Sequence, residues 1–141
     1  MDVDVQIIDY ERVYSAIKNL VDIDKDKAIN VGLKDAGNLF VRSGKSNLKS
    51  RSNVVTENLS KSFRVKIKQN KVGMIAGFGA GGNHAHLVDE GTTERYTAKG
   101  SFRGKVIGNS FWVDAIHQNE TAAIDKVYSG IERAVQNIIN K

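Results

Sequence analysis

The 141-residue sequence contains no cysteine, which excludes disulfide bonds, thiolate metal sites and a cysteine nucleophile. This absence fits a reducing compartment. No stretch approaches the roughly 18 consecutive apolar residues of a membrane-spanning helix, so no membrane partner is expected. The first residues, MDVDVQIIDYERV, lack the basic and apolar regions of a signal peptide, and none is expected.

The residues that are present have an ordinary globular composition. Hydrophobic residues make up 40% of the chain and charged residues 26%, both close to the averages for soluble domains. A chain of this length favours one domain, which we expect to span residues 1–141. It is long enough to fold around its own core without disulfides.

The net charge of +5 is unevenly distributed along the chain. The segment from Lys34 to Lys71 contains ten basic residues and only two acidic ones, Asp35 and Glu57. Three interpretations remain open for this segment. It could be a solvated face, one half of a charge-complementary protein interface, or a phosphate-binding surface for nucleic acid.

The first third of the chain predicts a short strand and two helices. Residues 3–9 alternate weakly, as expected of an edge strand. Asp9 is the expected N-cap of a helix of about three turns, on which Val13, Ile17 and Leu20 share one face. A longer helix is expected to begin at Asp24 and to end at Gly44. Its apolar and small residues fall on one face: Ala28, Ile29, Gly32, Leu33, Ala36 and Phe40.

A β-hairpin is predicted in the middle of the chain. Residues 43–60 are rich in Ser, Asn and Lys and indicate an exposed connection. SFRVKIKQN, residues 62–70, then alternates apolar and basic side chains, which predicts a half-buried strand with a basic outer face. VGMIAGFG, residues 72–79, follows after a short turn, so the two strands should pair antiparallel.

The last third predicts a long excursion followed by helix. Residues 92–110 contain spaced glycines and mixed polarity, with at most a short strand near Val106. Residues 111–118 predict one or two helical turns, and Asn119 is the expected cap of a final helix. Its apolar residues keep helical spacing: Ile124, Val127, Tyr128, Ile131, Val135 and Ile138. Together these elements predict an α+β domain, with N-terminal helices and a long C-terminal helix packed on a small antiparallel sheet.

The glycine-rich stretch GFGAGGNHAHLVDEGT, residues 77–92, has the highest density of potentially chemical residues. It lacks the Gly-Lys-Ser/Thr ending of a phosphate loop, and the Gly-x-Gly-x-x-Gly match at its start has no parallel βαβ unit around it. His84 and His86 could bind a metal with Asp89 or Glu90. Because the adjacent carboxylates diverge and no Gly-x-Ser-x-Gly motif occurs, no catalytic residue is expected.

The structural interpretation of this stretch is a corner between a strand and a short helix. Gly81 and Gly82 can supply positive φ where the strand turns sharply. Residues 84–90 can form a short helical segment that Gly91 ends. In that case the histidines pack or lie at the surface, and neither a metal nor another cofactor is expected.

HAHLVDEGT also resembles the signature of the tail-component family of long-tailed bacteriophages, which are head–tail joining or tail-completion proteins. The matching residues are His84 in the aromatic place, Ala85, Val88, Asp89 in the acidic place, Gly91 and Thr92. The order of elements agrees along nearly the whole chain. TENL, residues 56–59, resembles the Thr-Gly-x-Leu element with Glu57 in place of glycine, and NSFWVDAI resembles the turn into the last helix, without its usual prolines.

This resemblance implies a structural protein of the virion, made in the bacterial host cytoplasm, that completes the tail or joins it to the head. It would act as one subunit of a ring, most simply a hexamer, in contact with head-connector and tail proteins and with DNA in the channel. The expected inter-subunit loop carries four basic residues: Arg95, Lys99, Arg103 and Lys105. The candidate basic face carries Arg51, Arg64, Lys66 and Lys68.

Two other function classes remain open at this point. One is a small basic nucleic-acid-binding protein, although few aromatic residues accompany the basic segment. The other is a two-histidine metalloenzyme built on His84 and His86.

Overall fold

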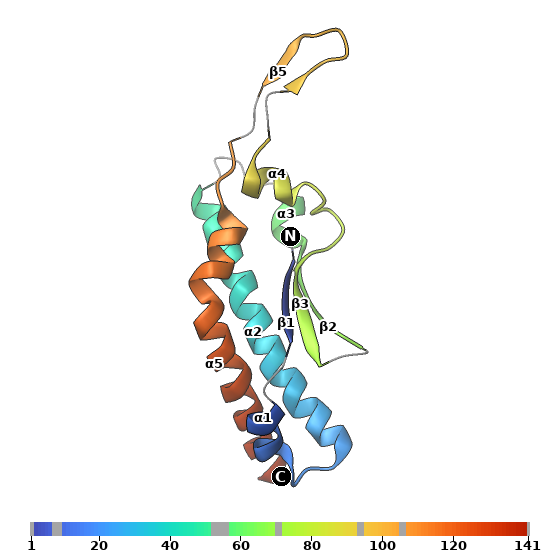
Figure 1. The fold of residues 1–141 in the computed structure, drawn as a ribbon, viewed down its shortest axis with the longest axis vertical. Helices are drawn as coiled ribbons and strands as arrows, with labels where there is room; N and C mark the ends of the chain where they lie inside the picture. Colours follow the sequence, from blue (N-terminus) through green and yellow to red (C-terminus); the bar gives the residue numbers. More distant parts are fainter. Residues whose placement is uncertain are drawn as a thin grey trace.

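Two long helices, α2 (Asp22–Arg51) and α5 (Phe111–Ile139), lie side by side and form the body of the molecule (Figure 1). The computed structural model describes residues 2–6, 10–51, 57–69, 72–92, 95–104 and 107–140. In α2, acidic residues lie in the first turn and basic residues in the last, which suits the helix dipole. The expected apolar face is confirmed, because all six of its residues are buried: Ala28, Ile29, Gly32, Leu33, Ala36 and Phe40.

Glycines let the two long helices approach closely. A Cβ on Gly32 would collide with the carbonyl oxygen of Val127, and a Cβ on Gly130 would lie 2.7 Å from the Cα of Gly32. The pair runs antiparallel, since Asp35 of α2 bonds Arg133 late in α5 at 2.8 Å, while the end of α2 contacts the start of α5. At this crossing the backbones of the two helices therefore contact each other directly, without side chains between them.

A three-stranded antiparallel sheet covers another face of α2. β3 (Gly73–Phe78) lies in the centre, between β1 (Val3–Gln6) and β2 (Phe63–Ile67). The predicted hairpin is confirmed, with Val65 opposite Ala76. The predicted edge strand near the N-terminus is β1, which pairs with β3 through Val5 and Met74. The remaining helices are α1 (Tyr10–Ile17), α3 (Glu57–Lys61) and α4 (Ala85–Glu90).

Four aromatic rings join the sheet to the start of α5. Phe63 and Phe78 pair across β2 and β3 with centroids 4.7 Å apart, and both contact Trp112, at 5.8 and 5.3 Å. Phe111 adds edge contacts to both phenylalanines. Because Phe111 and Trp112 are fully buried, this cluster anchors the first turn of α5 against the sheet.

The predicted end of the second helix at Gly44 is wrong. α2 continues to Arg51, seven residues beyond Gly44 and into the segment expected to be an exposed connection. Gly44 is buried, and the rings of Trp112 and Phe63 pack directly against it. A Cβ there would lie 2.7 Å from the Trp112 ring and 2.9 Å from the Phe63 ring. The glycine therefore serves packing and not helix termination.

The predicted N-cap at Asn119 is also wrong. α5 begins at Phe111 and runs without a break through Asn119, whose side-chain amide donates to the carbonyl of Ala115 at 2.7 Å. The two helical segments predicted for this region are thus one helix. The cap expected at Asp9 lies outside the described residues.

The excursion after the glycine-rich stretch is a small hairpin that projects beyond the body (Figure 1). β4 (Arg95–Tyr96) and β5 (Phe102–Gly104) pair antiparallel, and a tight turn closes them, with the amide of Thr97 donating to the carbonyl of Ser101 at 2.7 Å. Lys105 and the short strand predicted near Val106 lie outside the described residues. The molecule is therefore α+β, with helices on a small antiparallel sheet, as predicted.

Candidate functional site

The residues of the signature turn, His84 to Thr92, lie where α4 meets the beginning of α5. The predicted short helix is α4 itself, and Gly91 ends it with φ of 82°. Gly81 has the predicted positive φ, at 87°. The same prediction for Gly82 is wrong, because its φ is not positive. Gly82 is buried and serves packing, since a Cβ there would collide with the hydroxyl oxygen of Ser62.

Asp89 is the central residue of this junction. Its side chain is buried, and its Oδ1 accepts hydrogen bonds from the backbone N–H groups of Trp112 at 2.8 Å and Val113 at 3.2 Å. The first N–H groups of a helix have no partner within the helix and need an outside acceptor. Asp89 therefore caps α5 from another element, and its negative charge suits the positive end of the helix dipole.

Backbone contacts tie α4 to the segment before α5. The amides of Asn109 and Ser110 donate to the carbonyls of Val88 and Asp89, each at 3.0 Å. Gly108 permits this approach, because a Cβ there would lie 2.5 Å from the carbonyl oxygen of Asp89. Gly91 continues the contact as an antiparallel bridge to Ile107.

The end of α2 completes the junction from the other side. The Nη1 atom of Arg51 donates to the carbonyls of Asn109 at 3.0 Å and Ser110 at 3.2 Å, and it also bonds the carboxylate of Asp114. The side-chain amide of Asn47 donates to the carbonyl of Phe111 at 3.1 Å. Three separate elements, α2, α4 and the segment 107–110, thus hold the first turn of α5. We call this set of contacts the α5 junction.

The remaining signature residues position α4 or lie at its surface. Ala85 is buried and Val88 packs partly against the core, so both fix α4 on the body. His84 precedes α4, and its carbonyl accepts from the amide of Leu87 at 3.0 Å, whereas His86 is exposed. Within the described part of the chain, no three His, Asp or Glu residues gather in a way that could hold a metal ion.

The four residues of the candidate basic face do not share one surface role. Arg64 and Lys66 are exposed on the outer face of β2, as the alternation predicts. Arg51 belongs to the α5 junction, and Lys68 bonds Asp4 at 2.7 Å across the sheet. Two of the four cations are therefore already engaged with acidic groups of the same chain.

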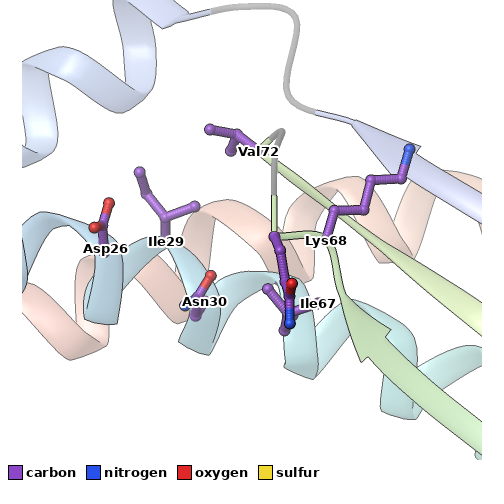
Figure 2. Close-up of a pocket in the computed structure, with 7 residues that line it drawn as sticks. Asp26, Ile29, Asn30, Ile67, Lys68 and Val72 are labelled. Atoms are coloured by element: carbon purple, nitrogen blue, oxygen red, sulfur yellow. The ribbon is translucent and has the colours of Figure 1, made fainter.

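Several polar side chains line shallow hollows of the surface. One hollow of about 540 Å³ lies between α2 and the turn of the β2–β3 hairpin and is lined by Asp26, Ile29, Asn30 and Lys68, among others (Figure 2). Figure 2 shows the Lys68 ammonium turned away from Asp26, toward the neighbouring strand. Among the described residues that line it, the hollow thus brings together no pair of groups suited to proton transfer.

Sequence reasoning missed most partners in the α5 junction. Asn109 and Ser110 directly precede the apolar pair Phe111–Trp112, and the Oδ1 of Asn109 accepts from the amide of Phe111 at 3.0 Å. Asn and Ser before an apolar run form a helix-start signal, which could have placed the start of α5 correctly. Asn47 carries no comparable local signal.

The fold and junction define an α+β protein in which a capping junction fixes two long antiparallel helices. Across the part of the chain that the structure describes, no helix has both the length and the apolar character to cross a membrane. The family model for the hemagglutinin repeat matches residues 19–105, and the chain belongs to that family. Neither a curated protein nor a solved structure matches the chain.

Proposed function

We propose that this protein is a structural subunit of a bacteriophage neck or tail end, which completes the tail or joins it to the head as part of a ring. The observation that carries the proposal is the capping of α5 by Asp89. The acidic residue of the signature is buried and bonds two helix N–H groups, and Gly91 ends the helix that presents it.

This observation supports the interpretation of the nine residues as a working motif. In a chance match of nine residues, the motif positions would have no common structural task. Here Val88, Asp89 and Gly91 all contact the α5 junction, and Ala85 holds α4 on the core. A shared task supports the resemblance to phage tail-component proteins and, through it, a ring of identical subunits, most simply six, around the DNA channel.

The shape of the molecule suits such a role. The β4–β5 hairpin projects from one end of the body and carries exposed aromatic side chains, Tyr96 and Phe102 (Figure 1). A ring needs a heterologous interface, in which two different surfaces of one subunit meet. A projecting element offers one of those surfaces.

The family match favours a second candidate, a cell-surface-binding repeat of the kind that the name hemagglutinin describes. The matched segment ends before α5, which supplies Phe111 and Trp112 to the core. Repeat architectures bury their apolar faces against the next repeat. In this chain the elements of the matched segment pack on α5 instead, so the first proposal accounts for more of the fold.

Nucleic-acid binding is less well supported by the arrangement of charges. Arg51 and Lys68 are paired with acids, which leaves the exposed Arg64 and Lys66 as a small basic patch on β2. DNA contact in a phage channel would still use such a patch. A steep loss of DNA affinity with rising salt would support this role.

The test of the proposed function is genetic and structural. Disruption of the gene in a phage or prophage that carries it should yield filled heads and tails that fail to join, or tails of abnormal end structure, seen by electron microscopy. Antibody labelling of intact particles should mark the neck or tail end. Normal particles without the protein would contradict the proposal, and agglutination of red cells by the purified chain would favour the second candidate.

A further inference from the structure

An apolar groove runs between β1 and α5. It has a volume of about 660 Å³ and is lined by Val3, Val5, Phe40, Ile116 and Ile124, with acidic residues at its rim. Ile124, a residue of α5, is 57% exposed. An apolar groove left open in this way is typical of a surface that another molecule covers.

The β4–β5 hairpin carries the complementary surface. Tyr96 and Phe102 stack with centroids 5.6 Å apart and remain 57% and 61% exposed. Residues 95–105 contain four basic residues and no acidic one. The hairpin thus carries an exposed aromatic pair, and its sequence has a net positive charge.

The groove rim has the opposite charge. Among the described residues, its charged lining residues are Asp4 and Glu120, and none that lines it is basic. The Asp4 carboxylate already accepts a hydrogen bond from the Lys68 ammonium at 2.7 Å. Glu120 is exposed, and it is therefore the acid expected to contact the hairpin. Lys99, in the exposed turn between β4 and β5, is the matching cation.

We propose that the β4–β5 hairpin of one copy of this chain docks in the groove between β1 and α5 of the next copy. The aromatic pair of Tyr96 and Phe102 covers the apolar floor, and Lys99 lies against Glu120. This pairing rests on the proposed ring, since it joins two different surfaces head to tail. A docked pair keeps one free hairpin and one free groove, which further copies fill until the ring closes. The occupant of the groove is therefore a second copy of the same chain.

The first test is a charge swap followed by sedimentation equilibrium. Lys99→Glu and Glu120→Lys should each weaken self-association, by roughly twofold to fivefold in Kd, as expected for an exposed ion pair. The double variant should restore the wild-type Kd, because the pair is re-formed with reversed signs. Glu132→Lys, an exposed acid on α5 that does not line the groove, is the matched control and should leave Kd unchanged.

The second test uses the absence of native cysteine. Ser101→Cys in the hairpin turn with Ile124→Cys in the groove should give, on oxidation of the concentrated protein, a ladder of covalent oligomers. Each single variant should stop at the dimer. Ser101→Cys with Ile139→Cys, near the far end of α5, should give no such ladder, and melting curves check that each variant is folded.

Three outcomes would overturn the docking. These are a wild type that stays monomeric at the highest workable concentration, a charge swap that fails to restore Kd, or equal ladders from the groove and control pairs. The proposed function is judged separately by antibody labelling of particles. A protein found in the tail whose cysteine pairs do not cross-link would keep the function and lose this interface.

Discussion

The carboxylate of Asp89 in α4 accepts a hydrogen bond from the backbone N–H of Trp112, in the first turn of α5, at 2.8 Å. The two residues are far apart in sequence, yet both are buried. One bond thus connects the signature turn to the aromatic cluster that holds α5 on the sheet. Two contacts set the start of α5. One is this long-range bond from Asp89, and the other is the local bond in which the Asn109 side chain accepts from the N–H of Phe111.

Replacement of Asp89 tests the stabilising role of this cap. Asp89→Ala removes the acceptor for two helix N–H groups, and we expect it to lower the free energy of unfolding by about 1–3 kcal/mol. Asp89→Asn keeps one oxygen acceptor and should lose less. The measurement is chemical denaturation followed by circular dichroism.

The control for that series is Glu90→Ala, which changes the adjacent exposed acid. Its unfolding free energy should stay within about 0.5 kcal/mol of the wild type, as is usual for surface positions. Equal losses at both positions would mean that Asp89 does not act as a cap.

Gly32→Ala tests the close crossing of α2 and α5. Alanine has the higher helix propensity by roughly 1 kcal/mol, so an isolated helix would gain stability from the change. In the protein the new Cβ would collide with the carbonyl oxygen of Val127, and overpacking of this kind costs about 1–3 kcal/mol or more. We expect a net loss of stability in thermal melting.

Asn38→Ala is the matched control on the same helix, because Asn38 is exposed. It should leave the melting temperature unchanged or raise it slightly, through helix propensity alone. A stabilised Gly32→Ala variant would show that the two helices do not approach as closely as described.

The sequence was sufficient for those elements whose pattern is local. Period-two alternation in residues 62–70 predicted β2, and the short turn after it predicted its antiparallel partner. The apolar face of α2 from Ala28 to Phe40 followed from helical spacing in the same way. In both cases neighbouring residues alone specify which side is buried.

The errors arose where a distant contact overrides a local signal. Gly44 is a typical helix-ending residue, but the rings of Trp112 and Phe63 occupy the space of its missing side chain. Asn is a typical helix cap, but α5 begins well before Asn119. Asp89 and Asn109 accept hydrogen bonds from the N–H groups of its first turn. The same holds for the α5 junction, in which Arg51 was expected on a basic surface and instead bonds Asp114.

The histidines yield a prediction about metal content. His84 begins α4 through its backbone and His86 is exposed, so neither has a fixed set of further ligands among the described residues. Elemental analysis of the purified protein should find no stoichiometric iron or zinc, and His84→Ala and His86→Ala should not alter the metal content. Stoichiometric metal that both variants lose would instead establish a metal site.

Deletion of the projecting hairpin should separate folding from assembly. Replacement of residues 95–105 by a short Gly-Ser linker removes β4 and β5 but retains the bridge between Gly91 and Ile107 that closes the loop onto the α5 junction. The exposed Tyr96 and Phe102 contribute little to the core, so the melting temperature should stay nearly constant. Head–tail joining in vitro should fail, because the proposed donor surface is gone. A large fall in melting temperature would make the hairpin part of the folding core, and normal joining by the deletion variant would exclude it as the interface between subunits.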